Sequence, residues 1–489
     1  MKQINPFRKN DELDITITGV TSEGQGVGRS NDVAIFVPFA IAGETVKVHI
    51  IKVEKRYCIA KIVSVVKSSE HRVLPMCEAY EKCGGCALMH MDYAEQLRVK
   101  YQIVQDALIH LGGFSDIEVQ PVLGMTDPTR YRNKGSFPFG WIDSAVAFGF
   151  YAERSHRLIP LFDCPIEDAR ITAIARTVAE WANRNRVPVY DETTHKGTLR
   201  VCVVRVTSTG ERMAVVVTKG ELPAKDALLK MLDVESLYHN RNDRETNVIF
   251  GDRFTLLKGR AQLIERQGDL EFFVSPQSFL QVNPLQTRVL YHETLRLLDP
   301  KETETVADVY CGIGTISLAI AKRAGRVIGI ESVPEAIEDA KRNATRNGIS
   351  NASFFCGLAE ETLPKLIQSG THVDAIVIDD EESYERMREI TGKISRRAKG
   401  RIRRYDGDAN IFEHYGLERQ LSEAFARKVP LKSGGYLVID ETEALVAVDV
   451  NTGHYKGTGS QEEAIYQVNM EAVEDDLSKS SFKMFSNAK

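Results

Sequence analysis

The stretch VADVYCGIGTISLAIAKRAGRVIGIE, residues 306–331, decides the fold of the second half of the chain. The short apolar runs VADVY and RVIGIE at its two ends are typical of buried strands. The run ISLAIAKRAG between them has helical character. A second helix, VPEAIEDAKRNATRNG, follows with Pro334 in its first turn, and the apolar strand VDAIVID then ends at Asp379. Strands that alternate with helices in this way predict a doubly wound α/β domain.

Gly312 and Gly314 lie in the turn between the first strand and the first helix. Two glycines there let the backbone pass close to a ligand at the carboxyl end of the strand, where open α/β sheets bind cofactors. Glu331 ends the second strand, a position from which a carboxylate can accept hydrogen bonds from both hydroxyls of a ribose. A third glycine at dinucleotide spacing is missing, so the arrangement favours the S-adenosylmethionine site of a class I methyltransferase over a nicotinamide site.

The first 70 residues alternate apolar and polar positions in short runs. The runs are ITITGV, VAIFVPF, VKVHIIKV and IAKIVSVV, and GQGVGRSND and IAGE separate them as turns. This pattern predicts a small antiparallel barrel over residues 1–70. Basic residues punctuate the later strands and fit a solvated edge and an RNA-facing surface equally well: Lys47, Lys52, Lys55, Arg56 and Lys61.

A mixed strand-and-loop domain is expected over residues 71–92 and 116–265. A helix interrupts it, because apolar residues recur at helical spacing before Gly112 and Gly113 close the run: Leu97, Tyr101, Val104, Leu108 and Leu111. We assign residues 93–115 with residues 266–379 to the α/β domain.

Three cysteines, Cys77, Cys83 and Cys86, fall within ten residues with the spacing Cx5CxxC. Such a group brings thiolates together on one metal centre, and Cys164, in a loop-like context beside a proline, is the best fourth ligand. A redox pair, a zinc site and ordinary core cysteines are the alternatives that the spacing leaves open. Of the remaining cysteines, Cys58, Cys202 and Cys356 are expected in strands or cores.

The composition, with 43% hydrophobic and 27% charged residues, is that of a soluble globular protein. No apolar run is long enough to span a bilayer and the N-terminus is too polar for a signal peptide, so we expect a cytoplasmic protein. The net charge of -5 argues against a general nucleic-acid coat protein, but one domain could still carry a basic RNA-binding surface.

Three segments resemble the family of RNA uracil-5-methyltransferases that modify 23S ribosomal RNA. They are SPQSFLQVNPLQTRVLY, DVYCGIGTISLAIA and GIESVPEAIEDAKRNATRNGISNASFFCGLAEE, and the similarity extends from the N-terminus to Asp379. The resemblance implies that the N-terminal barrel is a TRAM domain that holds ribosomal RNA, and that the cysteines bind a 4Fe-4S cluster. It also implies an S-adenosylmethionine pocket lined by Gln281, Tyr310, Glu331 and Asp379; no DNA or membrane partner is expected.

Carbon 5 of uracil becomes nucleophilic when a cysteine thiolate adds to carbon 6, and a general base later removes the proton from carbon 5. In the family that cysteine follows the fourth strand in a segment that begins Asp-Pro-Pro. Here Asp380 and Glu381 follow Asp379, and no cysteine occurs after Cys356. Cys311 is expected beside the cofactor rather than over the target ring. We therefore expect this chain to lack the catalytic cysteine and the base.

The residues from 380 to 474 resemble the ribonuclease E/G family, in YDGDANIFEHYGLERQLSEAFARKVPLKSGGYLVIDETEALVAVDVNTGHYKG and QVNMEAVE. Asp449 matches the first of two acids that hold Mg²⁺ in those enzymes, and the segment that carries the second acid is replaced by a tail over residues 475–489. One carboxylate holds Mg²⁺ weakly. A binding protein for RNA and S-adenosylmethionine without turnover, and a Mg²⁺-dependent ribonuclease, are therefore the alternatives to a methyltransferase.

Overall fold

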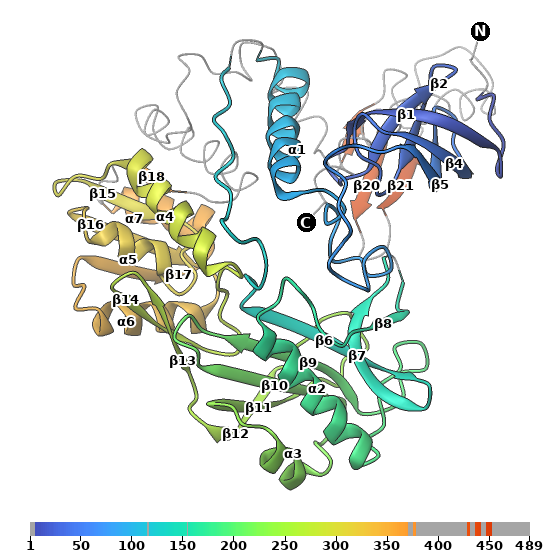
Figure 1. The fold of residues 1–489 in the computed structure, drawn as a ribbon. Helices are drawn as coiled ribbons and strands as arrows, with labels where there is room; N and C mark the ends of the chain where they lie inside the picture. The colour runs from blue at the N-terminus through green and yellow to red at the C-terminus, as the bar shows by residue number, and fades with distance from the viewer. Residues whose placement is uncertain are drawn as a thin grey trace. The chain divides into compact units, whose positions relative to one another are not determined.

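The computed structural model describes residues 5–114, 117–153 and 155–369, together with the backbone of the strands at 375–377, 428–430, 436–441 and 446–451 (Figure 1). Residues 1–402 form one unit and residues 403–489 a second, and each is described here by itself. None of the described helices is long and apolar enough to cross a bilayer.

The N-terminal strands close into a barrel in the order β1-β2-β3-β5-β4. They are β1 Glu12–Val20, β2 Gly26–Ser30, β3 Val33–Val37, β4 Thr45–Val53 and β5 Tyr57–Lys67. The predicted alternation holds, since Ile15, Ile17, Ile35, Val48 and Ile50 fill the interior. The barrel is therefore confirmed, but the β3–β5 pair that closes it is parallel rather than antiparallel.

A helix follows the barrel as predicted: α1 spans Tyr93–Asp106 and continues as the π-helical turn η1, Ala107–Leu111. The apolar stripe that predicted it is not its buried face, because Val104 and Leu111 are exposed. Instead Val99, one of two buried residues in α1, packs with Met91 and with Ile41 of the barrel. The buried face of α1 is therefore set by contact with the loop that contains Ile41, and the spacing of apolar residues within the helix does not reveal this contact.

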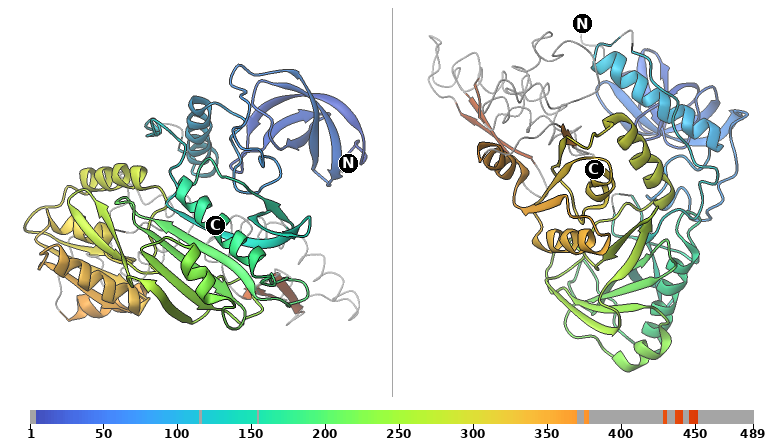
Figure 2. Two further views of the ribbon diagram at one scale, coloured as in Figure 1. Left: turned by 60° about the horizontal axis from the view of Figure 1, so that its bottom comes forward. Right: turned by 90° about the vertical axis from the view of Figure 1, so that its left-hand side faces the viewer.

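A seven-stranded sheet in the order β12-β11-β10-β9-β6-β7-β8 forms the central domain. Trp181 of α2 is fully buried against this sheet and donates from Nε1 to the Ala224 carbonyl at 3.1 Å. Figure 2 shows the domain from two further sides. Its elements are β6 Lys134–Ile142, β7 Ala145–Tyr151, β8 Leu158–Pro160, α2 Ala169–Arg184, β9 Leu199–Val206, β10 Arg212–Thr218, α3 Lys225–Met231, β11 Ser236–Arg241 and β12 Arg253–Gly259.

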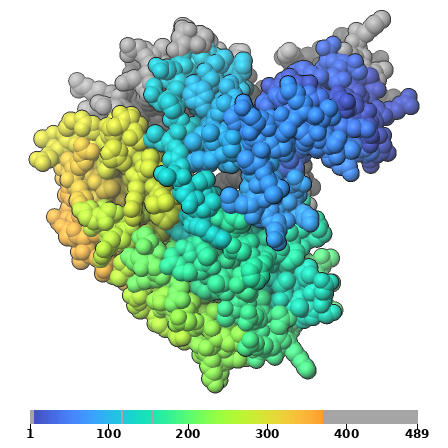
Figure 3. Space-filling model, viewed as in Figure 1, coloured from blue at the N-terminus to red at the C-terminus, as the bar shows by residue number. Residues whose placement is uncertain are grey.

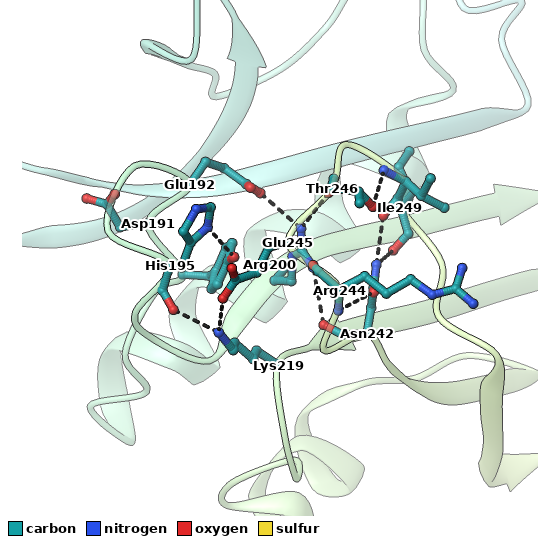
Figure 4. A network of polar contacts seen from close by, with 12 residues as sticks. Asp191, Glu192, His195, Arg200, Lys219, Asn242, Arg244, Glu245, Thr246 and Ile249 are labelled. Carbon is teal, nitrogen blue, oxygen red and sulfur yellow. Dashed lines mark hydrogen bonds and ion pairs between the residues drawn. The ribbon is translucent and has the colours of Figure 1, made fainter. Parts of the chain in front are cut away.

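A buried arginine fixes one long loop of this domain (Figure 4). Arg200 donates to the carbonyls of Asn242, Arg244 and Thr246 at 2.7–3.2 Å, and its guanidinium lies 4.4 Å from the centre of the Tyr190 ring. Its remaining contact is with Glu192 at 3.4 Å. Because both of its terminal nitrogens have hydrogen-bond partners, the arginine can be buried.

The α/β domain contains a parallel sheet in the order β17-β16-β15-β18, as the sequence predicts. β15 (Thr305–Asp308) has β16 on one side and β18 (Ala375–Val377) on the other. The order of the strands therefore reverses at β15, and its carboxyl end is the topological switch point. The other elements are β13 Leu263–Gln267, β14 Leu270–Val274, α4 Pro284–Leu298, α5 Thr315–Ala321, β16 Arg326–Glu331, α6 Pro334–Arg346, β17 Ala352–Cys356 and α7 Ala359–Gln368.

The strands described beyond residue 402 form a separate antiparallel sheet in the order β19-β20-β21. They are β19 Lys428–Pro430, β20 Tyr436–Glu441 and β21 Val446–Asn451. Asp449 pairs with Val438 within this sheet. Among the described strands of the first unit, β18 is at the edge of the parallel sheet.

Candidate cofactor site and cysteine cavity

The turn that follows β15 gives its two glycines different roles. Gly312 has a φ of +52°, and a Cβ placed on it would meet nothing within 4 Å, so open space lies beside its backbone. Gly314 has a φ of +83°, and its Cβ would stand 3.2–3.3 Å from Phe354 and Ala340. Gly314 therefore allows close packing against β17 and α6, whereas Gly312 leaves the space that a ligand needs.

Glu331, at the end of β16, points its carboxylate at this turn. Its Oε2 accepts a hydrogen bond from the Gly312 N–H at 3.2 Å, and its Oε1 accepts from the Val333 N–H at 2.9 Å and from the Ser332 hydroxyl at 3.1 Å. The carboxylate is thus held beside open backbone at the carboxyl ends of β15 and β16. This is the place predicted for a ribose acceptor, and the residues present fit the cofactor.

Two buried polar residues hold the turn, a third fixes the helix α6 behind it, and none of the three was found by sequence analysis. Asp308 accepts from the Ser317 hydroxyl at 2.5 Å, which joins β15 to α5. Asn343 donates to the Ile313 carbonyl at 3.0 Å and accepts from the Phe273 N–H at 2.7 Å. Asp339, one turn earlier on α6, accepts from Gln262. Two polar residues four apart on the inward face of α6 are the signal that could have revealed them.

The other predicted pocket residues lie as follows. The carbonyl of Gln281 accepts from Asn133 Nδ2 at 3.1 Å, so its loop is tied to the central domain. Tyr310 is half-buried and packs against the cluster that contains Ala307 and Ile330. Asp379 lies outside the described residues.

Two cysteines lie near the turn, and Cys311 does not have the properties of an activated nucleophile. Cys311 is 4% exposed, and burial, together with the nearby Asp308 and Glu331, raises the pKa of its thiol far above the ordinary range. Cys356 is exposed at the end of β17, where it pairs with Glu331, and its Sγ lies 3.7 Å from the Ser332 carbonyl oxygen.

The structure brings the predicted cysteine ligands together. Cys77, Cys83, Cys86 and Cys164 all line one cavity of about 330 Å³ in the central domain. Burial, with a smaller contribution from neighbouring thiols, raises the pKa of Cys86 and of Cys164 to about 11. Four thiols that line one shared cavity are a donor set for a cation or a cationic cluster.

Two basic residues, Arg132 and Lys134, line the same cavity. Burial and the nearby Arg205 lower the pKa of Lys134 to about 8, and the Arg132 guanidinium lies 3.4 Å from Glu167. In the described part of the chain, no three His, Cys, Asp or Glu side chains are spaced to hold a single metal ion. A four-iron cluster binds each thiolate to a different iron, so wider spacing is compatible with it.

Comparison with known proteins agrees with this architecture. The TRAM domain family matches residues 6–63, and a methyltransferase domain family matches residues 306–399. An uncharacterized RNA methyltransferase of Clostridium tetani is 45% identical over 386 residues, which are 78% of this chain and 84% of that protein. One from Halalkalibacterium halodurans is 43% identical over 385 residues, or 77% and 84% of the two chains. The chain belongs to the RNA methyltransferase family.

This RNA methyltransferase is also similar in structure to the tRNA (uracil-54, C5)-methyltransferase of Pyrococcus abyssi, solved in complex with S-adenosyl-L-homocysteine. The TM-score is 0.61 at 26% identity, and the match covers 78% of this chain and 87% of that one. The ribonuclease E/G family matches residues 354–477, so the second similarity begins at β17, inside the region matched by the methyltransferase domain. S-adenosylmethionine as the cofactor and RNA as the partner follow from these relationships.

Proposed function

We propose that this RNA methyltransferase has the architecture of an enzyme that methylates carbon 5 of a uridine in 23S ribosomal RNA, and that this chain binds cofactor and RNA without supplying the nucleophile. The observation that carries the proposal is the Glu331 carboxylate anchored on the Gly312 turn. The similarity to a uracil C5-methyltransferase supports the choice of base.

The described residues account for binding. S-adenosylmethionine supplies an electrophilic methyl group when it is bound. Glu331 would accept hydrogen bonds from the ribose hydroxyls, and the open backbone at Gly312 would allow the cofactor to approach β15. By family resemblance, Gln281, Tyr310 and Asp379 would complete the pocket around the methionyl part and the methyl group. The target uridine would enter by flipping out of its RNA context.

Methyl transfer needs two further groups that we do not assign to any residue. A thiolate must add to carbon 6 of uracil, and a base must remove the proton from carbon 5 before the thiolate leaves. Cys311 is buried and its raised pKa keeps it protonated, so it cannot replace the cysteine expected after Asp379. We therefore assign binding, and not turnover, to this chain.

We further propose that Cys77, Cys83, Cys86 and Cys164 hold a 4Fe-4S cluster, because all four thiols line one cavity. Zinc is the alternative metal. Iron and sulfide content after anaerobic purification distinguishes the two: a brown protein that contains iron supports the cluster, and a colourless protein that contains zinc contradicts it.

A second function has one specific observation in its favour, the match of residues 354–477 to the ribonuclease E/G family. In this reading Asp449 would bind Mg²⁺ for RNA cleavage, but one carboxylate binds Mg²⁺ weakly. Cleavage of a 5'-monophosphorylated RNA that depends on Mg²⁺ and disappears in Asp449→Asn would establish it.

Binding of the two proposed ligands tests the main function. Titration of the full chain with S-adenosylhomocysteine in a calorimeter should show one site. Titration with a transcript of unmodified 23S ribosomal RNA domains should show saturable binding that weakens as salt rises. A chain that binds neither ligand would contradict the proposal.

A further inference from the structure

Phe162 presents its ring to solvent at a fixed place on the central domain. The residue lies between β8 and α2 and is 74% exposed, slightly more than Phe279 at 72%. A single exposed apolar side chain is common on protein surfaces and needs no explanation by itself. The contacts that surround this ring distinguish it from that ordinary case.

A guanidinium lies over one face of the ring. The Cζ of Arg176, from α2, is 3.9 Å from the centre of the Phe162 ring, and its Nη2 donates to the carbonyl of Phe162 at 2.5 Å. The Nε of Arg176 is buried and has no hydrogen-bond partner among the described residues. One arginine therefore holds both the backbone and the ring of Phe162, and the opposite face of the ring stays open.

The residues on both sides of Phe162 are fixed as well. The Leu161 N–H donates to the Phe148 carbonyl at 3.0 Å. Asp163 accepts from both terminal nitrogens of Arg130 at 2.5 and 2.9 Å and from the Thr172 hydroxyl at 2.9 Å. An exposed ring on a backbone that is pinned at three successive residues loses little conformational entropy when a ligand stacks on it.

A basic segment runs from this ring toward the cofactor loop. Residues 130–132 pair with the segment that follows Phe162, since the Arg130 and Arg132 N–H groups donate to the carbonyls of Pro165 and Ile166 at 2.8 and 2.9 Å. The next residue, Asn133, donates from its N–H to the Val282 carbonyl at 2.9 Å, in the loop that carries Gln281. Residues 130–133 thus connect the segment that follows Phe162 with the loop that carries Gln281.

We propose that Phe162, supported by Arg176, is a stacking platform for an unpaired base of the RNA substrate, outside the pocket for the target uridine. The proposal rests on the RNA-binding function proposed above. An open aromatic face over a planar cation is a combination that binds single-stranded RNA with little sequence preference. A protein partner would gain little from a lone ring with a guanidinium beneath it, so RNA is the occupant that the chemistry favours.

Substitution of the ring tests the platform in the full chain. The variants are Phe162→Ala, Phe162→Trp, which keeps a stacking face, and Trp141→Ala, a matched control in which an exposed ring is lost from the tip of the β6–β7 hairpin. Trp141 is 55% exposed, and no cation–π contact to it occurs among the described residues. The probe is an unstructured oligoribonucleotide of mixed sequence, labelled for fluorescence anisotropy and carrying 2-aminopurine in a second version.

Phe162→Ala should weaken binding of this RNA roughly tenfold, because a stacked base contributes about that much to affinity. The salt dependence should not change, since no phosphate contact is lost. The quenching of 2-aminopurine should also decrease, whereas Phe162→Trp and Trp141→Ala should bind as the wild type does. All variants should keep the wild-type melting temperature, because the altered rings are exposed.

The outcomes separate the platform from the proposed function. If the wild type binds RNA and S-adenosylhomocysteine but Phe162→Ala binds RNA equally well, the platform is wrong and the proposed function stands. An equal loss in Phe162→Ala and Trp141→Ala also overturns the platform, because it shows no special role for the supported ring. If the wild type binds S-adenosylhomocysteine but no RNA, both proposals are wrong.

Discussion

Replacement of Glu331 by glutamine should weaken cofactor binding without unfolding the domain. The carboxylate accepts three hydrogen bonds from the protein at 2.9–3.2 Å, and those from Val333 and Ser332 reach Oε1, which the amide oxygen of glutamine can replace. The amide nitrogen would instead face the Gly312 N–H, so two donors would meet there. One accepted hydrogen bond from the ribose and the negative charge would also be lost.

A hydrogen bond to a charged group contributes about 1.5–3 kcal/mol, so the affinity should fall roughly 10- to 150-fold. Isothermal titration with S-adenosylhomocysteine measures this change directly. Glu335→Gln is the matched control, because Glu335 is an exposed acid in the first turn of α6 and should bind the cofactor as the wild type does. An unchanged affinity in Glu331→Gln, with Glu335→Gln also unchanged, would refute the assignment of this carboxylate to the ribose.

Three further predictions concern the central domain and the segment that leads into it. Cys164→Ser should lower the iron content per chain and the visible absorption of anaerobically purified protein, because it removes one of the four proposed ligands. An iron content equal to that of the wild type would contradict the assignment of Cys164 as a ligand. Arg200→Ala should reduce the free energy of unfolding by about 3–5 kcal/mol in urea titrations, since it leaves buried carbonyls without donors, whereas the exposed Arg184→Ala should change it by less than about 0.5 kcal/mol. His90 is buried, which lowers the pKa of its imidazole to about 4; the unfolded chain therefore binds a proton first, and stability should fall as pH drops from about 6.5 to about 4. His90→Asn should lose less stability than the wild type between these two pH values, and an identical loss would show that another group is responsible.

Short-range sequence patterns predicted the elements that form the candidate cofactor site. The strand, glycine turn, helix, strand and acid of residues 306–331 depend on short-range geometry, so they led directly to the contact between Gly312 and Glu331. The barrel was predicted for the same reason, since alternation along each strand reports which side is buried. The spacing of Cys77, Cys83 and Cys86 predicted their proximity, and the structure places Cys164 in the same cavity.

These patterns could not predict contacts between segments that are distant in the sequence. β9 is buried on both faces, so nothing in its sequence marks Arg200 as the residue that holds a loop more than 40 residues away. The helix α1 was predicted from its apolar spacing, but that spacing does not mark its buried face, because Ile41, in a barrel loop, packs with Val99. The stack of Arg176 on Phe162 likewise joins a loop to a helix and leaves no periodic signal.

Methyl transfer to RNA tests the central claim most directly. The full chain would be incubated with S-adenosylmethionine labelled in its methyl group and with unmodified 23S ribosomal RNA, and both the label bound to protein and the label in RNA would be counted. The account predicts cofactor bound at about one equivalent, through Glu331 and the Gly312 turn, and no label in RNA above that of a reaction without protein. Label at carbon 5 of a uridine would contradict the assignment of binding without turnover.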